Sequence, residues 1–305
     1  MLKKGLKSLG SFLGATISEW SGDNVSRLSA AIGFYAVFTT APLLVILIAV
    51  AGFVYGEQAV RGRIVNEIQA YIGPKGAEVV QGMIAGASKQ STGVWATILA
   101  FAALLFGASG FFIQLQGALN TVWGVQQKPG GSMVIGFLKN RLVSVIMVLL
   151  TGLLLIALMA GTSVIWTVTE YFHHLLPLTP VFWQVIDFLV VFVLLTLIFA
   201  LVMRTVPDVK IRWRDVWMGA LVTSILFTIG QFLLGLYLGR KSFTSSYGVA
   251  GSFVLILVWV YYSAQSFLIG AEMTQIYSRR YGKEIEPADN AVRVRKQTGP
   301  PPEER

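Results

Sequence analysis

The sequence predicts an all-α polytopic membrane protein with six transmembrane helices. Hydrophobic residues make up 55% of the 305 residues and charged residues only 13%, whereas a soluble domain has about 25% charged residues. Apolar runs long enough to cross a bilayer recur along the whole chain, and polar turns separate them. One integral membrane domain therefore fits better than the two soluble domains that the length alone would suggest.

We expect the membrane domain to occupy residues 29–277, and its spans to be the apolar runs at about 29–55, 94–122, 141–168, 181–203, 216–238 and 249–272. Pro42 lies inside the first run, after two threonines. Because proline removes an N–H and kinks a helix, Pro42 is a candidate hinge. A tolerated kink without a functional role is the favoured alternative.

Three segments outside the spans have their own patterns. In residues 1–28, leucines, Ile17 and Trp20 recur every three or four positions opposite several lysines, which predicts an amphipathic helix. This helix either lies on the membrane surface or packs on the protein. Residues 56–92 are charged and hold two short amphipathic stretches, so we expect a helical hairpin outside the membrane. Residues 278–305 are predicted to be a charged, disordered cytoplasmic tail.

The distribution of positive charge predicts the orientation. With both termini in the cytoplasm, 18 of the 24 Lys and Arg residues fall on the cytoplasmic side. Because cytoplasmic loops of membrane proteins carry the excess of Lys and Arg, we expect both termini inside.

Glu272 and Asp187 are the acids that fall within the predicted spans. A charged side chain at the bilayer centre costs about 2.5–3.5 kcal/mol on insertion scales, so such residues are candidate proton or substrate sites. The alternative is that Glu272 reaches the inner interface, or pairs with Arg279 or another basic residue. We favour this structural alternative for both acids.

Amide side chains could surround Glu272 in the bundle interior. Gln265 lies seven positions before Glu272, so both can share one face of a helix, and three more amides lie in other predicted spans: Gln231, Gln114 and Asn120. They could line a polar cavity, or they could form hydrogen bonds that hold the helices together. The sequence leaves both open.

A polar turn precedes the last span and is predicted on the outer face. Its candidate contacts for an anionic headgroup are Arg240, Lys241, Ser245, Ser246 and Tyr247. An ordinary interfacial loop with solvated charges is equally compatible with this composition.

Several activities lack the residues they need. The chain has no cysteine and only two histidines, which are adjacent and therefore poorly placed to share a metal. It also lacks the GxxxxGK[ST] pattern of a P-loop. We therefore expect no catalytic residues, no metal site, no cofactor and no nucleic-acid partner. Membrane lipids are the expected partners, and a homo-oligomer remains open.

Five stretches carry a resemblance to a known family: 29–54 (SAAIGFYAVFTTAPLLVILIAVAGFV), 105–125, 206–219 (VPDVKIRWRDVWMG), 234–248 (LGLYLGRKSFTSSYG) and 258–277 with its Gly-Ala-Glu. Their order and spacing resemble the YihY/BrkB family of bacterial inner-membrane proteins. The resemblance implies six membrane helices with both termini cytoplasmic, which agrees with the charge count. Family members have been labelled as virulence factors or as ribonuclease BN, and export of lipids or other envelope components has been the working idea.

The residues and the resemblance together predict a transporter or flippase that moves an amphiphilic or anionic envelope component without ATP. The alternative is a membrane scaffold or envelope assembly factor that transports nothing. A ribonuclease would need several convergent carboxylates or histidines for its metals, and the chain does not supply such a set.

Overall fold

The computed structural model describes residues 2–56, 58, 61–62, 65–66, 77–78, 80–82, 85, 110–128, 180–239, 244–282 and 285–294. For helix residues 2–9, 40–43, 45–47, 49–55, 180, 183, 187, 237–239 and 244–253 it describes the backbone alone. The helices are α1 (Leu2–Gly22), α2 (Val25–Tyr55), an unlabelled helix at 110–123, α6 (Pro180–Thr205), α7 (Trp213–Gly239) and α8 (Thr244–Tyr281). The strands are β1 (Val125–Gln127), β2 (Val209–Lys210), β3 (Glu286–Pro287) and β4 (Ala291–Arg293).

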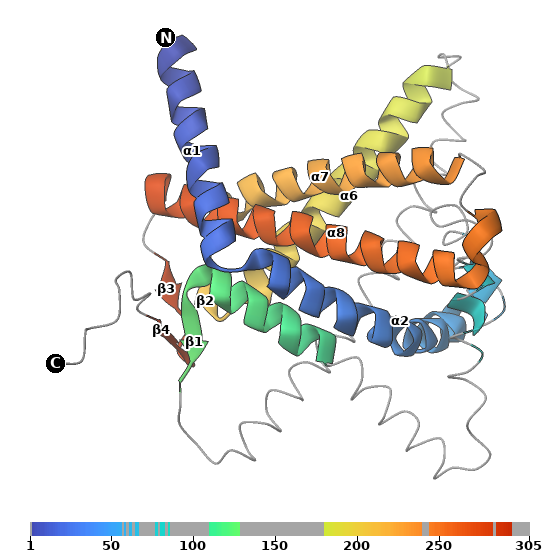
Figure 1. The fold of residues 1–305 in the computed structure, drawn as a ribbon. Helices are drawn as coiled ribbons and strands as arrows, with labels where there is room; N and C mark the ends of the chain where they lie inside the picture. Colours follow the sequence, from blue (N-terminus) through green and yellow to red (C-terminus); the bar gives the residue numbers. More distant parts are fainter. Residues whose placement is uncertain are drawn as a thin grey trace.

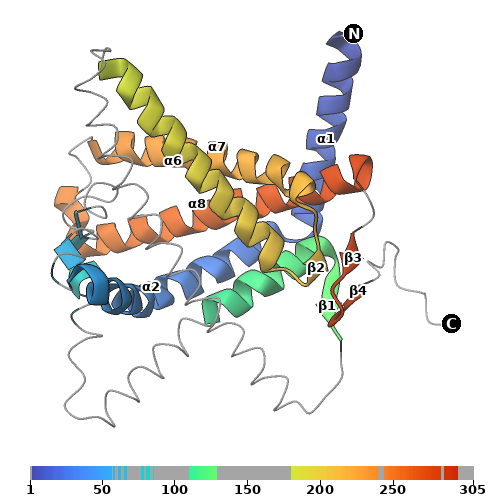
Figure 2. The same cartoon turned by 180° about the vertical axis from the view of Figure 1, so that it is seen from behind.

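Helix α8 is the central element of the bundle. It packs against α7 on one side and α2 on the other, and α1 crosses its C-terminal end (Figure 1). Helix α6 packs on α7 and crosses in front of it in the view from behind (Figure 2). The helix at 110–123 joins α2 in the same buried cluster through Leu115, Leu119 and Val122. The core therefore forms around α8.

Glycines allow helices α7 and α8 to pack closely against each other. A Cβ atom added to Gly270 would lie 1.9 Å from Thr223 Oγ1, and one added to Gly219 would lie 2.1 Å from the Gly270 carbonyl oxygen. Further along, a Cβ on Gly230 would lie 2.0 Å from the Tyr262 ring. Small residues at such positions let helix backbones approach closely in a membrane. The contacts also show that α7 and α8 run antiparallel.

Three described helices are long and apolar enough to cross a membrane: Gln184–Thr205, Trp213–Leu236 and Val254–Tyr281. They correspond to the fourth, fifth and sixth predicted spans. The first predicted span is the continuous helix α2, which runs through Pro42, and part of the second is the helix at 110–123. The predicted span 141–168 lies outside the described residues, as does most of the hairpin 56–92, whose described positions after Gly56 are helical.

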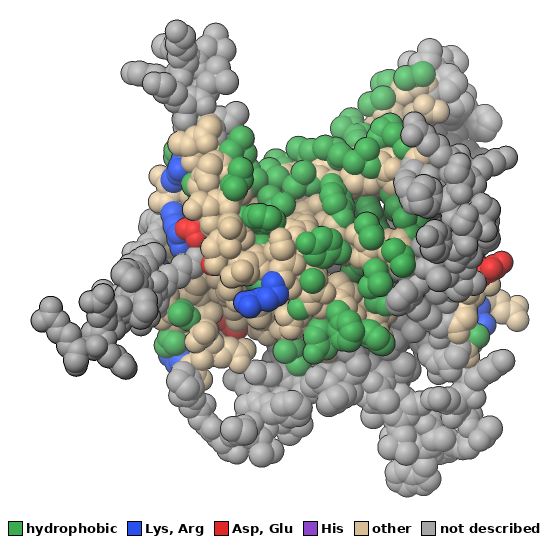
Figure 3. Space-filling view, viewed as in Figure 1, with side chains coloured by type: hydrophobic (Ala, Val, Ile, Leu, Met, Phe, Trp, Pro, Cys, Tyr) green, Lys and Arg blue, Asp and Glu red, His purple; other side chains and the backbone are tan. Residues whose placement is uncertain are grey.

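The outer surface of these helices is apolar, as contact with lipid requires. Exposed large hydrophobic side chains include Phe188 and Leu189 on α6 and Phe232 and Leu233 on α7. Hydrophobic side chains are spread over the middle of the face in Figure 3 among polar and backbone atoms, while several charged side chains lie toward its left. This pattern matches a bundle whose middle faces hydrocarbon.

Four short strands gather at one end of the bundle, which we call the strand end. β1 pairs antiparallel with β4, and β2 pairs antiparallel with β3 (Figure 1). The expectation of a disordered tail from residue 278 is therefore wrong for most of its first half. α8 continues to Tyr281, and residues 285–294 are held by two earlier loops through backbone hydrogen bonds such as Ala288 N–H to the Asp208 carbonyl. The remainder, 295–305, lies outside the described residues.

Helix α1 packs on the protein through one of its faces. Phe12 is buried against Met273 and Ile276 of α8. Leu13 and Ile17 nevertheless stay exposed, so one apolar face of α1 remains uncovered by the described residues.

Candidate functional site

One face of α8 carries a row of polar side chains toward the strand end. Gln265, Glu272, Gln275 and Arg279 recur at the spacing that places residues on one side of a helix. The Trp20 indole N–H donates to Gln265 Oε1 at 3.0 Å, and the Gln265 amide donates to Tyr261 Oη at 2.7 Å. Gln275 donates through Nε2 to the carbonyl oxygen of Val122. The row therefore meets α1 and the helix at 110–123.

Glu272 lies in the middle of this row and is 0% exposed. Its neighbours along α8, Leu268 and Ala271, are equally buried. The side chain of Glu272 therefore lies inside the described bundle and not on its surface. Arg279, one candidate partner, forms its ion pair with Glu19 of α1 at 3.1 Å.

The other predicted cavity residues lie at different levels of the bundle. Gly230 faces Tyr262, so the half-buried Gln231 next to it lies roughly 15 Å along α8 from Glu272, at 1.5 Å per residue. Gln114 is half-buried, and it lies about 12 Å along its helix from Val122, the level of Gln275. The described residues thus place Gln265 on the face of Glu272, and Gln231 and Gln114 elsewhere.

Asn120 contacts a residue that the sequence analysis did not single out. Its side-chain amide donates to Asp208 Oδ2 at 2.8 Å, and its Oδ1 accepts the Asp208 backbone N–H at 2.8 Å. Three further amides donate to the same carboxylate: Gln116 at 3.2 Å, Gln127 at 3.3 Å and Asn290 at 2.8 Å. We call this set of five residues the Asp208 cluster.

The Asp208 cluster joins four segments of the strand end. Gln116 and Asn120 come from the helix at 110–123, Gln127 from β1, Asp208 from the loop after α6, and Asn290 from the turn before β4. Asp208 is only 8% exposed, and amide donors satisfy its buried charge, as a buried carboxylate requires. Its position after Pro207, in a turn between two spans, is the signal that could have suggested a structural role.

The remaining predicted residues lie where their side chains are not described. Asp187 lies in α6, and Pro42 lies in α2. Ser245, Ser246 and Tyr247 belong to the first turns of α8, which begins at Thr244, so the predicted polar turn is helical at these positions. Arg240 and Lys241 lie outside the described residues.

Membrane-length helices, an apolar outer surface and a buried acid within one span define a polytopic integral membrane protein. The profile of the family named Virulence factor BrkB matches residues 16–295. The chain belongs to this BrkB family.

Similar proteins carry the name UPF0761 membrane protein. The one from Verminephrobacter eiseniae is 26% identical over 265 residues, which cover 84% of this chain and 59% of that protein. The one from Legionella pneumophila strain Corby is 24% identical over 293 residues, which cover 92% of this chain and 66% of that protein. The chain thus spans about three fifths to two thirds of the length of these curated relatives. No solved structure matches it.

Proposed function

We propose that this protein is a transporter or flippase that moves an amphiphilic, anionic component of the bacterial envelope without ATP. The observation that carries the proposal is the complete burial of Glu272 within the span Val254–Tyr281. An ionisable side chain that faces the interior of a membrane bundle is costly and typically belongs to a substrate or proton pathway. In this proposal Glu272 exchanges a proton as the bundle opens.

We also propose that the protein lies in the inner membrane with both termini in the cytoplasm. The segments expected inside are α1, the loops after 123 and after 205, and the segment after α8, and the strand end contains parts of all four (Figure 1). Basic residues at this end include Lys128, Lys210, Arg279 and Arg280. Such a concentration of positive charge at one end supports a cytoplasmic strand end.

The proposed partners are membrane lipids, and the proposal assigns the chain no enzymatic activity, cofactor or nucleic acid. A lipid-like cargo agrees with a protein surface made of apolar helices. The basic outer turn at Arg240 and Lys241 remains the predicted contact for an anionic headgroup. A homo-oligomer is compatible with all of these assignments.

The test is reconstitution of the purified protein in liposomes, with labelled phosphatidylglycerol followed between leaflets with and without a pH gradient. We expect movement that needs the protein and that falls at least tenfold in Glu272→Gln. Glu286→Gln is the matched control, because Glu286 is an exposed acid in β3, outside the spans. Movement that is equal in wild type and Glu272→Gln would remove Glu272 from the pathway. No movement of any anionic lipid would count against the transport proposal itself.

A scaffold without transport activity is the second candidate function. Its supporting observation is that predicted cavity residues form hydrogen bonds within the chain, as Asn120 does with Asp208 and Gln265 with Trp20. Such bonds hold helices together in a membrane. A stable, stoichiometric protein partner retained in mild detergent, together with inactive proteoliposomes, would favour this candidate.

A further inference from the structure

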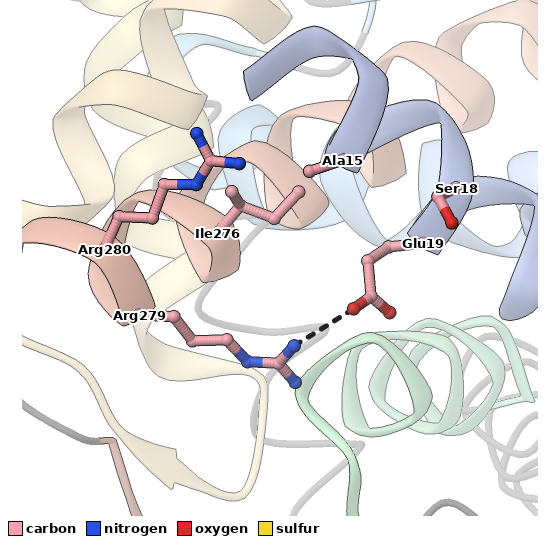
Figure 4. A pocket seen from close by; sticks show the side chains of 6 residues that line it. All are labelled: Ala15, Ser18, Glu19, Ile276, Arg279 and Arg280. Atoms are coloured by element: carbon pink, nitrogen blue, oxygen red, sulfur yellow. Dashed lines mark hydrogen bonds and ion pairs between the residues drawn. The ribbon is translucent and has the colours of Figure 1, made fainter. Parts of the chain in front are cut away.

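A pocket of about 250 Å³ opens between α1 and the end of α8. Its lining residues are Ala15, Ser18 and Glu19 of α1, and Ile276, Arg279 and Arg280 of α8 (Figure 4). We propose that this pocket binds the phosphate headgroup of an anionic phospholipid from the membrane leaflet at the strand end. The site is separate from Glu272 and does not depend on transport.

The charge of the pocket suits a phosphate. Both arginines extend from α8, and their side chains diverge, with that of Arg279 pointing toward Glu19 (Figure 4). Arg279 donates through Nη1 to Glu19 Oε1 at 3.1 Å, and Arg280 donates to the Ser11 hydroxyl and carbonyl oxygens at 3.2 and 3.0 Å. Each guanidinium has five N–H donors in a fixed fork, so these contacts orient the arginines without using all their donors. The Ser18 hydroxyl adds a further polar group to the wall.

The pocket lies at the level where a membrane interface is expected. Gly219 of α7 lies against Gly270 and Thr274 of α8, so Trp213, six residues earlier in the antiparallel α7, is level with the region of Arg279. Trp213 and Trp217 are exposed, and the Arg204 guanidinium lies 4.4 Å above the Trp213 ring. Exposed tryptophans mark the headgroup level of a bilayer. The two arginines are therefore at the height of lipid phosphates.

The surroundings also suit a lipid rather than a soluble anion. The lining itself includes the apolar side chains Ala15 and Ile276. Phe12 is buried, and the Arg280 guanidinium lies 5.7 Å from its ring centroid. Apolar side chains in the wall of a basic pocket give an acyl chain apolar contact while its headgroup meets the arginines.

Loss of the Glu19 carboxylate is predicted to strengthen lipid binding, although it removes an ion pair. The carboxylate pairs with Arg279 and lines the same pocket, so it competes with an incoming phosphate for the guanidinium. Glu19→Gln removes an ion pair that helps hold α1, yet it should tighten lipid binding by about twofold to fivefold. A purely structural role for these residues predicts no such gain.

The experiment counts lipids bound to the purified full chain by native mass spectrometry, during titration with phosphatidylglycerol or phosphatidylcholine in neutral detergent. We expect preferential phosphatidylglycerol binding that weakens about fivefold or more in Arg280→Gln. Ser18→Phe fills the pocket but keeps both arginine contacts with α1, and it should cause a similar loss. Arg214→Gln removes an exposed arginine of α7 outside this lining and should bind as wild type does.

Three outcomes would overturn the proposal. Equal binding of the two lipids would show that the protein does not recognise an anionic headgroup. Full binding by Ser18→Phe would show that the lipid does not bind in the pocket. Displacement of phosphatidylglycerol by millimolar glycerol 3-phosphate would assign the pocket to a soluble phosphate instead. A gain of binding in Glu19→Gln together with a loss in Ser18→Phe would support it.

Discussion

The side chain of Asn120 holds Asp208 by two opposed hydrogen bonds, one to its carboxylate and one from its backbone N–H, each 2.8 Å long. The two residues are 88 positions apart. This pair fixes the end of the helix at 110–123 to the loop between α6 and α7, and the Asn290 amide then ties the segment after α8 to the same carboxylate.

Asp208→Asn should destabilise the protein by about 2–3 kcal/mol, because the amides that now donate to a buried charge would face an amide with one acceptor oxygen. The measurement is the midpoint of thermal unfolding in detergent. Asp289→Asn changes an exposed acid in the same region and should shift the midpoint far less. Equal shifts in the two variants would contradict a special role of the Asp208 cluster.

Gly270→Ala should destabilise the α7–α8 pair, because its new methyl group would meet Thr223 Oγ1 at 1.9 Å. Overpacking of this kind typically costs about 1–3 kcal/mol. Adding Thr223→Ala removes the closest atom and should restore part of the loss in thermal stability. Gly117→Ala is the matched control, since a Cβ there meets nothing within 4 Å. A midpoint unchanged by Gly270→Ala would argue against this close approach.

Truncation after residue 282 should loosen the strand end, because it removes β3, β4 and Asn290 together. We expect the peptide 116–128 to exchange its amide hydrogens faster, as measured by mass spectrometry in detergent. Truncation after residue 294 keeps these elements and should leave the exchange unchanged. If both truncations behave alike, the contacts of 285–294 do not stabilise the strand end.

The ion pair between Lys210 and Asp289, 2.7 Å long, should make the attachment of 285–294 depend on pH and salt. The hydrogen bond and charge of Lys210 lower the pKa of Asp289 below its usual 3.8, and the same contacts raise the pKa of Lys210 above 10.5. Because the pKa of Asp289 is lowered, this group stabilises the folded state above pH 3.8, and the stabilisation is lost as the pH falls through its pKa in the folded protein. Because the pKa of Lys210 is raised, this group stabilises the folded state below pH 10.5, and the stabilisation is lost as the pH rises through its pKa in the folded protein.

Both groups are fully exposed, so the effect is small and salt should screen it. Hydrogen exchange of the peptide 285–294 should therefore accelerate between 50 mM and 1 M salt in the wild type. Asp289→Asn should abolish this salt dependence at neutral pH. If hydrogen exchange of the variant still depended on salt, charges other than this ion pair would cause the dependence.

The long apolar helices could be predicted from the sequence because their signal is local. The length and composition of runs such as 181–203 and 216–238 are enough to predict a span, and α6 and α7 lie where they were expected. Glu272 was found for the same reason, as an acid in an apolar run. Its burial inside the bundle required the packing of α2 and α8, which no local pattern contains.

The Asp208 cluster could not be predicted because its contacts are distant in sequence. Asp208 lies in a loop rich in basic residues, where an acid is ordinarily solvated, and its partners Asn120 and Asn290 lie 88 and 82 positions away. Asn120 was selected as a polar residue of a span, but its partner belongs to a loop. The strands at 286–287 and 291–293 are too short for an alternating pattern, so charge and proline dominated the prediction of disorder.

The pairing of β1 with β4 also has a consequence for biosynthesis. β1 leaves the ribosome more than 150 residues before its partner, so its backbone groups wait unpaired while α6, α7 and α8 are inserted. The strand end can form only after the last described helix has entered the membrane. The segment after α8 thus completes the fold last. In a nascent chain stalled before residue 285, the helices would be present but the Asp208 carboxylate would still lack its hydrogen bond from Asn290.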